Sequence, residues 1–233
     1  MNLCIIIPIH VMEHSDDVDA IFSYNTNLSK HKWNEITFHK TDGYFINRAD
    51  AMNDGFNKHC KENDYVMFLH CDTKLPCNYA EKLYDFFFEQ KTIPFCFFRL
   101  SFDTTEQLIT PKIIEYFVNE SRKEPYGDQC FTMSSSFFRN NGLFQSLLLL
   151  EDVAFYRVIQ KRYDLIYDDH VITECAITSD RRFRSEGKYI SELSFCKNVC
   201  NNRIIIMLHK LGVSPNVLGK WYYKNNLCGS LNG

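Results

Sequence analysis

The sequence lacks an excess of positive charge and has no long apolar run. It contains 26 lysine and arginine residues against 29 aspartate and glutamate residues, so its formal net charge is −3. With this balance the surface as a whole is not built to hold nucleic acid or an anionic membrane, and basic sites must be local. No window approaches the ~20 apolar residues that a membrane-spanning helix needs. We therefore expect no nucleic-acid partner and at most a peripheral contact with a membrane.

The ten cysteines lack the spacing of a zinc or redox motif. No two cysteines are separated by two residues, and the nearest pairs are Cys196 with Cys200 and Cys71 with Cys77. The N-terminus is apolar, but it is short, has no basic region and is interrupted by Pro8, so it predicts a strand and not a signal peptide. These features indicate a cytoplasmic protein with reduced thiols.

Strand and helix patterns alternate in the first half of the 233-residue chain and mix in the second. Apolar runs and alternation predict strands over residues 3–9, 35–39, 65–69, 93–100, 129–135 and 171–178. Helical spacing predicts helices over residues 16–25, 47–61, 78–90, 105–119 (with a possible break at Pro111), 151–162, 190–211 and from Pro215 onward. With no repeat and no low-complexity linker, this order predicts one α/β domain with a Rossmann-like first half.

Polar residues follow two of the expected strands. Pro8 stands at the end of the first strand, and His70, Cys71 and Asp72 follow the third, before an expected turn over residues 73–76. Ligands of open α/β sheets bind outside the carboxyl ends of the strands, so this edge is the candidate site. Taken alone, Asp72 is either the cap of a turn or a carboxylate ligand for a hard cation.

Two further clusters carry groups suited to proton or phosphate chemistry. Glu151 and Asp152 begin a helix, where carboxylates either complement the helix dipole or serve as a general base. Arg181 and Arg182 form either a solvated basic turn or a clamp on a diphosphate, because guanidinium groups bind phosphate in a bidentate manner.

Seven motifs carry a resemblance to one enzyme family. They are CIIIPIH from Cys4, NRADAMNDGF from Asn47, FLHCDTKLP from Phe68, GDQCFTMSSSFF from Gly127, EDVAFYRVIQ from Glu151, SDRRFRSEGKY from Ser179 and LHKLGVSPNVLGKWY from Leu208. In this order they resemble the GT-A-fold, family-two inverting glycosyltransferases, and more narrowly a small soluble subgroup with an F-L-H-A-D-T-x-L-P signature. The resemblance covers nearly the whole chain. It implies a GT-A-like, mainly parallel mixed sheet flanked by helices, and inverting, metal-dependent transfer of a sugar from a nucleotide donor to an acceptor hydroxyl.

The resemblance divides the chain into a nucleotide-sugar half, residues 1–100, and an acceptor half, residues 101–233. It places a divalent cation on Asp72, where the cation neutralises the leaving diphosphate. His70 stands where the related motif often has a second aspartate, and it becomes a conditional second ligand. An imidazole tolerates Mn²⁺ better than Mg²⁺, so Mn²⁺ is the expected cation.

The same resemblance gives roles to the other clusters. Asp152 removes the acceptor proton, and Glu151 holds the acceptor or orients the helix. Arg181 and Arg182 clamp the diphosphate. Asp128, in a Gly-Asp-Gln element, contacts the acceptor, although a simple turn is an equal alternative.

Two residues of the donor-binding half are candidates for contact with the donor. Arg48 lies in a first helical turn, where phosphate can be bound, and Pro8 ends the first strand. The same half departs from the family pattern at the nucleobase. Relatives carry D-G-G-S-x-D-G-T after the first helix, and the first aspartate of this motif reads the nucleobase. Here either Asp42 in Thr41-Asp42-Gly43 is the remnant of that motif or the strand-helix unit that carries it is lost, so the donor need not be a UDP-sugar.

Two other functions remain open from the sequence. A metal-dependent nucleotidyltransferase could use the same first half, and a non-catalytic nucleotide-sugar-binding protein would fit the shortened base-binding strand. The acceptor could be a glycan, a lipid-linked molecule or a small molecule. The C-terminal run KLGVSPNVLGKWYYK mixes basic and aromatic residues, which fits either packing on the core or contact with a membrane surface.

Overall fold

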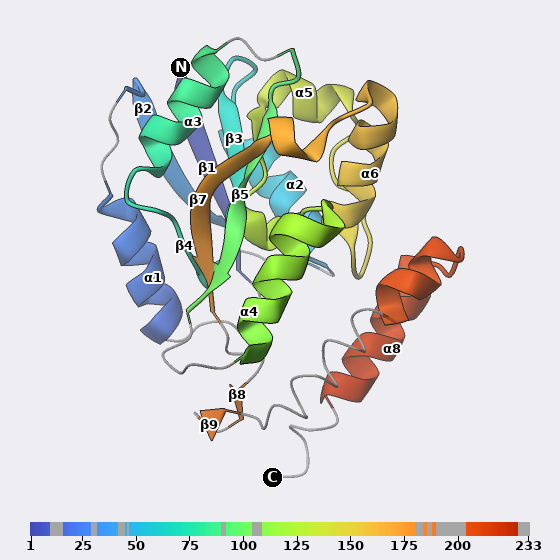
Figure 1. Ribbon diagram of the computed structural model, residues 1–233. Helices are drawn as coiled ribbons and strands as arrows, with labels where there is room; N and C mark the ends of the chain where they lie inside the picture. Colours follow the sequence, from blue (N-terminus) through green and yellow to red (C-terminus); the bar gives the residue numbers. More distant parts are fainter. Residues whose placement is uncertain are drawn as a thin grey trace.

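The computed structural model describes residues 1–9, 16–28, 32–41, 45, 47–89, 92–103, 109–179, 184–185, 188–189 and 204–227. A seven-stranded sheet with the order β2-β1-β3-β6-β5-β7-β4 forms its centre (Figure 1). The strands are β1 (Asn2–Pro8), β2 (Glu35–Thr41), β3 (Tyr65–Phe68), β4 (Thr73–Lys74), β5 (Phe95–Phe102), β6 (Thr132–Ser134) and β7 (Val171–Thr178). A separate two-stranded sheet pairs β8 (Arg184–Ser185) with β9 (Lys188–Tyr189).

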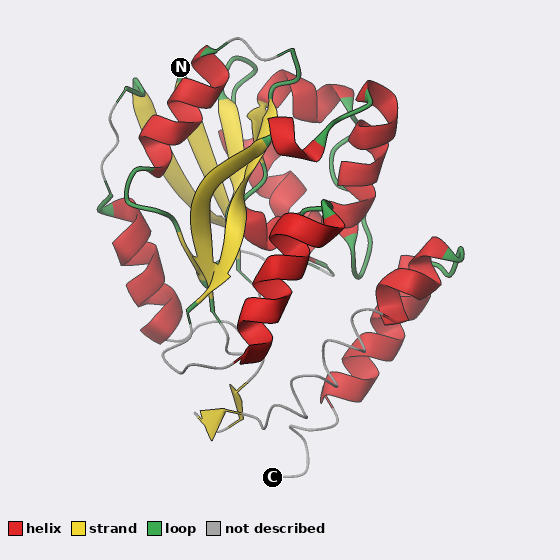
Figure 2. Ribbon diagram, in the orientation of Figure 1, coloured by secondary structure: helices red, strands yellow, loops and turns green. Residues whose placement is uncertain are grey.

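Helices cover both faces of the large sheet (Figure 2). The α-helices are α1 (Asp16–Thr26), α2 (Arg48–His59), α3 (Tyr79–Phe88), α4 (Ile109–Tyr116), α5 (Ser135–Asn140), α6 (Glu151–Tyr163) and α8 (Pro215–Leu227). A π-helical segment, Phe117–Arg122, continues α4, and short 3₁₀ turns cover Gly127–Gln129 and Tyr167–Asp169. Residues 204–210 are also helical.

The long strand pairings are parallel, as the sequence pattern predicts. β1 lies between β2 and β3 and runs parallel to both, and β5 runs parallel to β7. Short antiparallel pairings join β6 to β3 and β5, and β4 to β7. Parallel strands are covered on both faces, which explains why every residue of β1 from Leu3 to Pro8 is buried.

Alternate residues of β1 supply two cores on opposite faces of the sheet. Leu3, Ile5 and Ile7 pack in one cluster with residues of α1 and α3. Cys4 and Ile6 pack in the other cluster with residues of α2, α5 and α6. Side chains of a strand alternate between faces, so an unbroken apolar run is what a strand with two covered faces requires. The two cores hold the sheet edge that carries the candidate site.

Two predictions about local structure need correction. Pro111 does not break a helix, because it is the third residue of α4, where a missing backbone N–H costs no hydrogen bond. The strand predicted over residues 129–135 is confined to Thr132–Ser134. Its first part is a 3₁₀ turn that ends at Cys130 with a left-handed backbone (φ 57°), which a strand cannot include.

The turn predicted over residues 73–76 is wrong in its first half. Thr73 and Lys74 form β4 and pair antiparallel with Thr178 and Ile177 of β7. The turn covers residues 70–73 instead, since the Thr73 N–H donates to the carbonyl of His70 at 3.1 Å. A strand of two residues leaves too short a pattern to recognise in a sequence.

The C-terminal segment packs against the body through a small third cluster. Ile205, Ile206 and Leu218 contact Leu150 and Val153 at the start of α6. The first part of the helix predicted over residues 190–211 lies outside the described residues. In the part of the chain that the structure describes, no helix has the length and apolarity needed to cross a bilayer.

Candidate active site

Five polar side chains from distant parts of the chain meet beyond the carboxyl end of β3. They are Arg48 at the start of α2, His70 after β3, Asp128 in the 3₁₀ turn, and Glu151 and Asp152 at the start of α6. The chain crosses this edge repeatedly because parallel strands with helical crossovers deliver their carboxyl ends to one side of the sheet.

Arg48 is the centre of this cluster. Its Nε donates to Oε1 of Glu151 at 2.5 Å, and its Nη2 lies 3.7 Å from Oδ2 of Asp152. Burial opposes the charge of Arg48, but the attraction of Glu151, Asp152 and then Asp128 outweighs it and raises the pKa of Arg48 above its ordinary value. Asn47 caps α2 by accepting the Asp50 N–H at 2.8 Å, which places Arg48 in the first turn.

Both ring nitrogens of His70 contact charged side chains. Nη1 of Arg48 lies 2.8 Å from Nε2 of His70, and Nδ1 of His70 contacts Oδ1 of Asp128. The same Nη1 lies 3.4 Å from Nδ1, so the guanidinium lies against the imidazole ring and contacts both of its nitrogens. His70 therefore links the 3₁₀ turn to α2.

Asp152 is buried, with 6% of the residue exposed, and its oxygens accept backbone hydrogen bonds. Oδ2 accepts the Gly127 N–H at 2.6 Å, and Oδ1 accepts the N–H of Val153 at 2.7 Å. A carboxylate offers about four lone-pair directions, so these bonds orient Asp152 and leave acceptor capacity for a further hydroxyl.

Gly127 allows this close approach. A Cβ at this position would lie 3.0 Å from both Oδ2 of Asp152 and Nε2 of His70. The backbone is also strained beside the pair of acids, since Leu150 caps α6 in the left-handed region (φ 65°) that favours glycine. Packing of Leu150 against the C-terminal segment holds that conformation.

Asp72 lies in the tight turn between β3 and β4 and is 6% exposed. Its carbonyl accepts the Ser179 N–H at 3.0 Å, and Thr73 and Thr178 share a hydrogen bond between hydroxyls at 3.2 Å. Asn25 fixes the other side of the turn, because its Nδ2 donates to the carbonyl of Thr73 at 2.9 Å. Sequence reasoning missed Asn25, and a buried asparagine at the end of an amphipathic helix leaves no signal in a pattern.

The other residues predicted to bind the nucleotide-sugar donor divide into two groups. Pro8 ends β1 opposite Thr41, whose Oγ1 accepts the N–H of Ile9 at 3.2 Å. Asp42, Arg181 and Arg182 lie outside the described residues. Ser179, the last described residue before both arginines, donates its N–H to the carbonyl of Asp72.

The side chains at this edge that could coordinate a metal suit a cation only in part. Among the described residues, no three histidine, cysteine, aspartate or glutamate side chains form a group that could hold a metal ion. His70 would have to give up Arg48 or Asp128 to coordinate one. A single carboxylate such as Asp72 is nevertheless a usual protein ligand for Mg²⁺ when phosphate oxygens complete the shell. The contacts of His70 therefore count against it as a ligand, and Asp72 as the ligand of a cation that arrives with a diphosphate stays a prediction.

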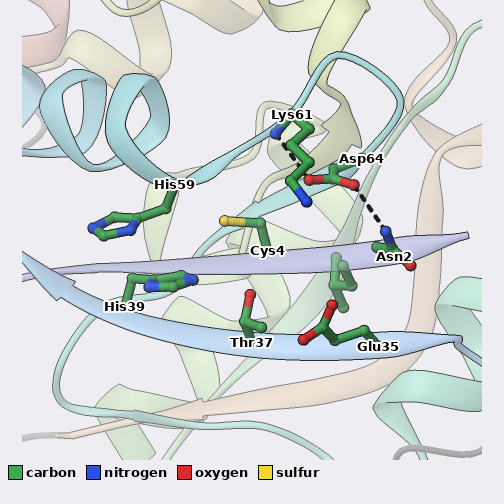
Figure 3. A pocket seen from close by; sticks show the side chains of 9 residues that line it. Asn2, Cys4, Glu35, Thr37, His39, His59, Lys61 and Asp64 are labelled. Atoms are coloured by element: carbon green, nitrogen blue, oxygen red, sulfur yellow. Dashed lines mark hydrogen bonds between the residues drawn. The ribbon is translucent and has the colours of Figure 1, made fainter.

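A cavity of about 190 Å³ lies at the opposite end of α2 (Figure 3). It is lined by the first residues of β1 and β2 and by His59, Lys61 and Asp64 after or at the end of α2. Arg48 and His59 begin and end α2, which at 1.5 Å per residue separates them by about 16 Å. The cavity is therefore remote from the polar cluster.

Two histidines stack in that cavity, and we expect the pair to make the free energy of unfolding depend on pH. The rings of His39 and His59 lie 4.0 Å apart between centroids, with 10° between their planes. Burial and then the charge of His59 lower the pKa of His39. The unfolded chain, with an ordinary pKa of about 6.5, then binds more protons below that pH. Stability should be full above about pH 6.5 and should fall as the pH drops towards the folded pKa.

The His39→Gln variant tests this expectation by thermal unfolding. Between about pH 7.5 and about pH 5, the melting temperature of the variant should fall less than that of the wild type. Carboxylates titrate in both proteins, so the difference between them isolates His39. An equal fall in both proteins would show that the stacked pair does not control this range.

Comparison by sequence gives no relatives. No family model matches the chain, and no curated protein matches it either.

Comparison by structure gives a likeness of fold. S. aureus TarS 1-349 in complex with UDP-GlcNAc aligns with a TM-score of 0.51 and 10% identity, over 81% of this chain and 60% of that chain. This likeness confirms the predicted GT-A-like α/β fold, and at 10% identity it shows the fold alone. The chain spans 60% of the length of that structure.

Two other solved structures align with lower scores. The catalytic domain of Drosophila beta1,4galactosyltransferase 7 with xylobiose aligns with a TM-score of 0.46 and 14% identity, over 75% of this chain and 64% of that chain. Glucosyl-3-phosphoglycerate synthase from Mycobacterium tuberculosis with Mn²⁺ and UDP-glucose aligns with a TM-score of 0.46 and 8% identity, over 76% of this chain and 70% of that chain.

Proposed function

We propose that this protein transfers a sugar from a nucleotide-sugar donor to an acceptor hydroxyl with inversion at the anomeric carbon. The observation that carries the proposal is the oriented carboxylate of Asp152, buried beside Glu151 and Arg48 at the carboxyl edge of a GT-A-like sheet. Such a site combines a base with the edge where sheets of this kind bind ligands.

Asp152 is the general base in this proposal. It accepts the proton of the acceptor hydroxyl while the acceptor oxygen attacks the anomeric carbon. The bond from that carbon to the diphosphate oxygen breaks, and the nucleoside diphosphate leaves with the electron pair. The Gly127 and Val153 amides hold the carboxylate in place, so its geometry does not depend on the acceptor.

Arg48 and Glu151 position the base. The ion pair between them ties the start of α2 to the start of α6, and the contacts of Arg48 favour this role over direct donor binding. Asp128 orients His70 and faces the same edge, from which we propose that it contacts the acceptor or sugar hydroxyls.

The cluster carries more negative than positive charge, so a diphosphate bound beside it needs an additional positively charged partner. Glu151, Asp152 and Asp128 place three negative charges around the one positive charge of Arg48. We propose that Asp72 holds a divalent cation and that Arg181 and Arg182 contact the diphosphate. The cation would supply charge neutralisation of the leaving group. The preference for Mn²⁺ came from His70, and with that ring engaged Mn²⁺ and Mg²⁺ both suit the carboxylate.

The remaining roles follow the halves of the chain. Pro8 and Asp42 belong to the donor side, in residues 1–100, and the acceptor side lies in residues 101–233. Arg48, His70 and Asp72 come from the first half, and Asp128, Glu151 and Asp152 from the second, so the site would form between them. The acceptor is a glycan, a lipid-linked molecule or a small molecule.

A thermal-shift panel of UDP-, GDP-, CMP- and dTDP-sugars, with and without Mn²⁺ or Mg²⁺, tests the proposal. A donor at about 100 times its Kd adds roughly 2.7 kcal/mol to the free energy of unfolding. For a chain of this length that raises the melting temperature by roughly 5–10 °C. We expect one nucleotide class to act and its effect to require a divalent cation.

Matched variants make the panel specific. Asp72→Asn should remove the cation-dependent part of the shift, while Asp54→Asn, a partly exposed residue of α2, should retain it. No shift with any donor would contradict the proposed function. Release of pyrophosphate from a nucleoside triphosphate would instead indicate a nucleotidyltransferase.

A further inference from the structure

The C-terminal helical segments expose an unusual number of large apolar side chains. Within 18 residues, five such side chains are more than two fifths exposed: Ile204 (43%), Met207 (54%), Leu211 (73%), Val217 (59%) and Trp221 (43%). Scattered single exposed apolar residues are normal, but a group of this kind marks a surface that meets something apolar.

In residues 204–211, the first of these C-terminal segments, the exposed apolar side chains form one stripe. Ile204, Met207 and Leu211 have the i, i+3, i+7 spacing of a single helix face. The opposite face carries Ile205 and Ile206, which are buried against the body of the protein. The segment is therefore apolar on both sides, and packing on the core accounts for only one of them.

α8 repeats this arrangement. Leu218 is buried in the same cluster, and a Cβ at Gly219 would lie 2.6 Å from Cβ of Leu148, so this face is pressed against the body. Val217 and Trp221 are one helical turn apart on the exposed face. Trp has an apolar ring with a polar N–H, which suits a boundary between water and lipid.

The charge of this region has one sign. Residues 204–227 contain Lys210, Lys220 and Lys224 and no aspartate or glutamate, whereas the whole chain has a net charge of −3. Lys210 and Lys220 are exposed like the apolar residues beside them. Exposed apolar stripes with lysines and no acidic residue match the composition of helices that lie in a membrane interface.

We propose that residues 204–227 bind an anionic lipid surface, with the apolar stripes inserted among the head groups and Lys210 and Lys220 facing lipid phosphates. A second copy of the chain fits less well. In a two-fold contact through this surface, Lys210 and Lys220 would meet the same lysines with no acidic residue of the segment to neutralise them. Anionic lipids attract such residues electrostatically.

This surface lies close to the start of α6. Leu150 and Val153, which flank Glu151 and Asp152, pack directly on the buried face of the C-terminal segments. The exposed face is one helix diameter further out, about 10–12 Å. Lipid binding would therefore bring a membrane near the acidic end of α6, whether or not the protein transfers sugars.

Vesicle co-sedimentation of the full chain tests the inference. Vesicles of phosphatidylcholine with roughly one third phosphatidylserine should sediment the protein, and phosphatidylcholine alone should not. High salt should weaken the binding, because it screens the lysines. The double variant Met207→Glu, Leu211→Glu should bind at least about 10-fold more weakly.

The control replaces an equally exposed apolar residue elsewhere. Phe88→Glu changes a side chain of α3 that is 66% exposed, and it should bind vesicles like the wild type. Thermal unfolding of both variants should match the wild type, which separates lost binding from lost folding.

Tryptophan emission gives a second readout. The chain has two tryptophans, of which Trp33 is buried (7% exposed) and Trp221 is exposed. Anionic vesicles should shift the emission to shorter wavelength, and Trp221→Phe should abolish the shift. Equal binding by the double variant, or self-association without vesicle binding, would overturn the proposal.

Discussion

Replacing Asp152 by asparagine is expected to slow sugar transfer by about 10²–10⁴-fold, the range that general-base catalysis contributes. The amide keeps a carbonyl oxygen for the N–H of Gly127, but it cannot take up the acceptor proton. Donor binding should change little, because the diphosphate is assigned to other residues. The measurement is the release of nucleoside diphosphate from the donor that stabilises the wild type most.

The control for this variant is a carboxylate of similar chemistry outside the cluster. Asp54→Asn on α2 removes one partner of the partly exposed pair with Lys58 and should turn over at close to the wild-type rate. If Asp152→Asn also kept the wild-type rate while binding donor normally, the base would have to be another group. Retained activity in Asp72→Ala as well would refute the assignment of the whole site.

The second large effect is expected on stability. Arg48→Met leaves Glu151, whose side chain is 3% exposed, and Asp152, at 8%, without their guanidinium partner. Removing one partner of a buried pair costs about 3–5 kcal/mol. Because the Arg48 side chain is 33% exposed, we expect the lower end, about 3 kcal/mol. The melting temperature should then fall by roughly 6–12 °C.

Two variants separate this ion pair from a general effect of charge removal. Lys58→Met breaks the pair with Asp54 on the same helix, at 2.7 Å, and should cost less than about 0.5 kcal/mol because both partners are more exposed. Adding Glu151→Gln to Arg48→Met should recover part of the loss, since it removes the uncompensated carboxylate. Equal costs for Arg48→Met and Lys58→Met would disprove a buried network.

Elements with strong local patterns were predictable with nearly their observed bounds. The strand over residues 171–178 has the predicted limits, and the helix predicted over 151–162 extends one residue further, to Tyr163. These segments combine apolar periodicity with clear boundary residues. β4 and α5 were missed because two and six residues are too few to establish a period.

The candidate site was predictable in its members more than in its contacts. The motifs pointed to Arg48, His70, Asp128, Glu151 and Asp152, and the structure brings all five together. The pairing could not be foreseen, because any of the acids could have faced the guanidinium. Which partner is nearest depends on the helix positions, and these depend on packing along the whole sheet.

The alternation of strands and helices and the chemical character of the sheet edge follow from local periodicity and residue type, so both could be predicted without a structure. Packing between distant elements is what brings Arg48 to Glu151, 103 residues away, and the ring of His70 to Asp128 and Arg48. The same packing places Asn25 in hydrogen-bonding contact with the turn that holds Asp72 and leaves the C-terminal apolar stripes exposed. These outcomes depend on distances between elements, which no local pattern encodes.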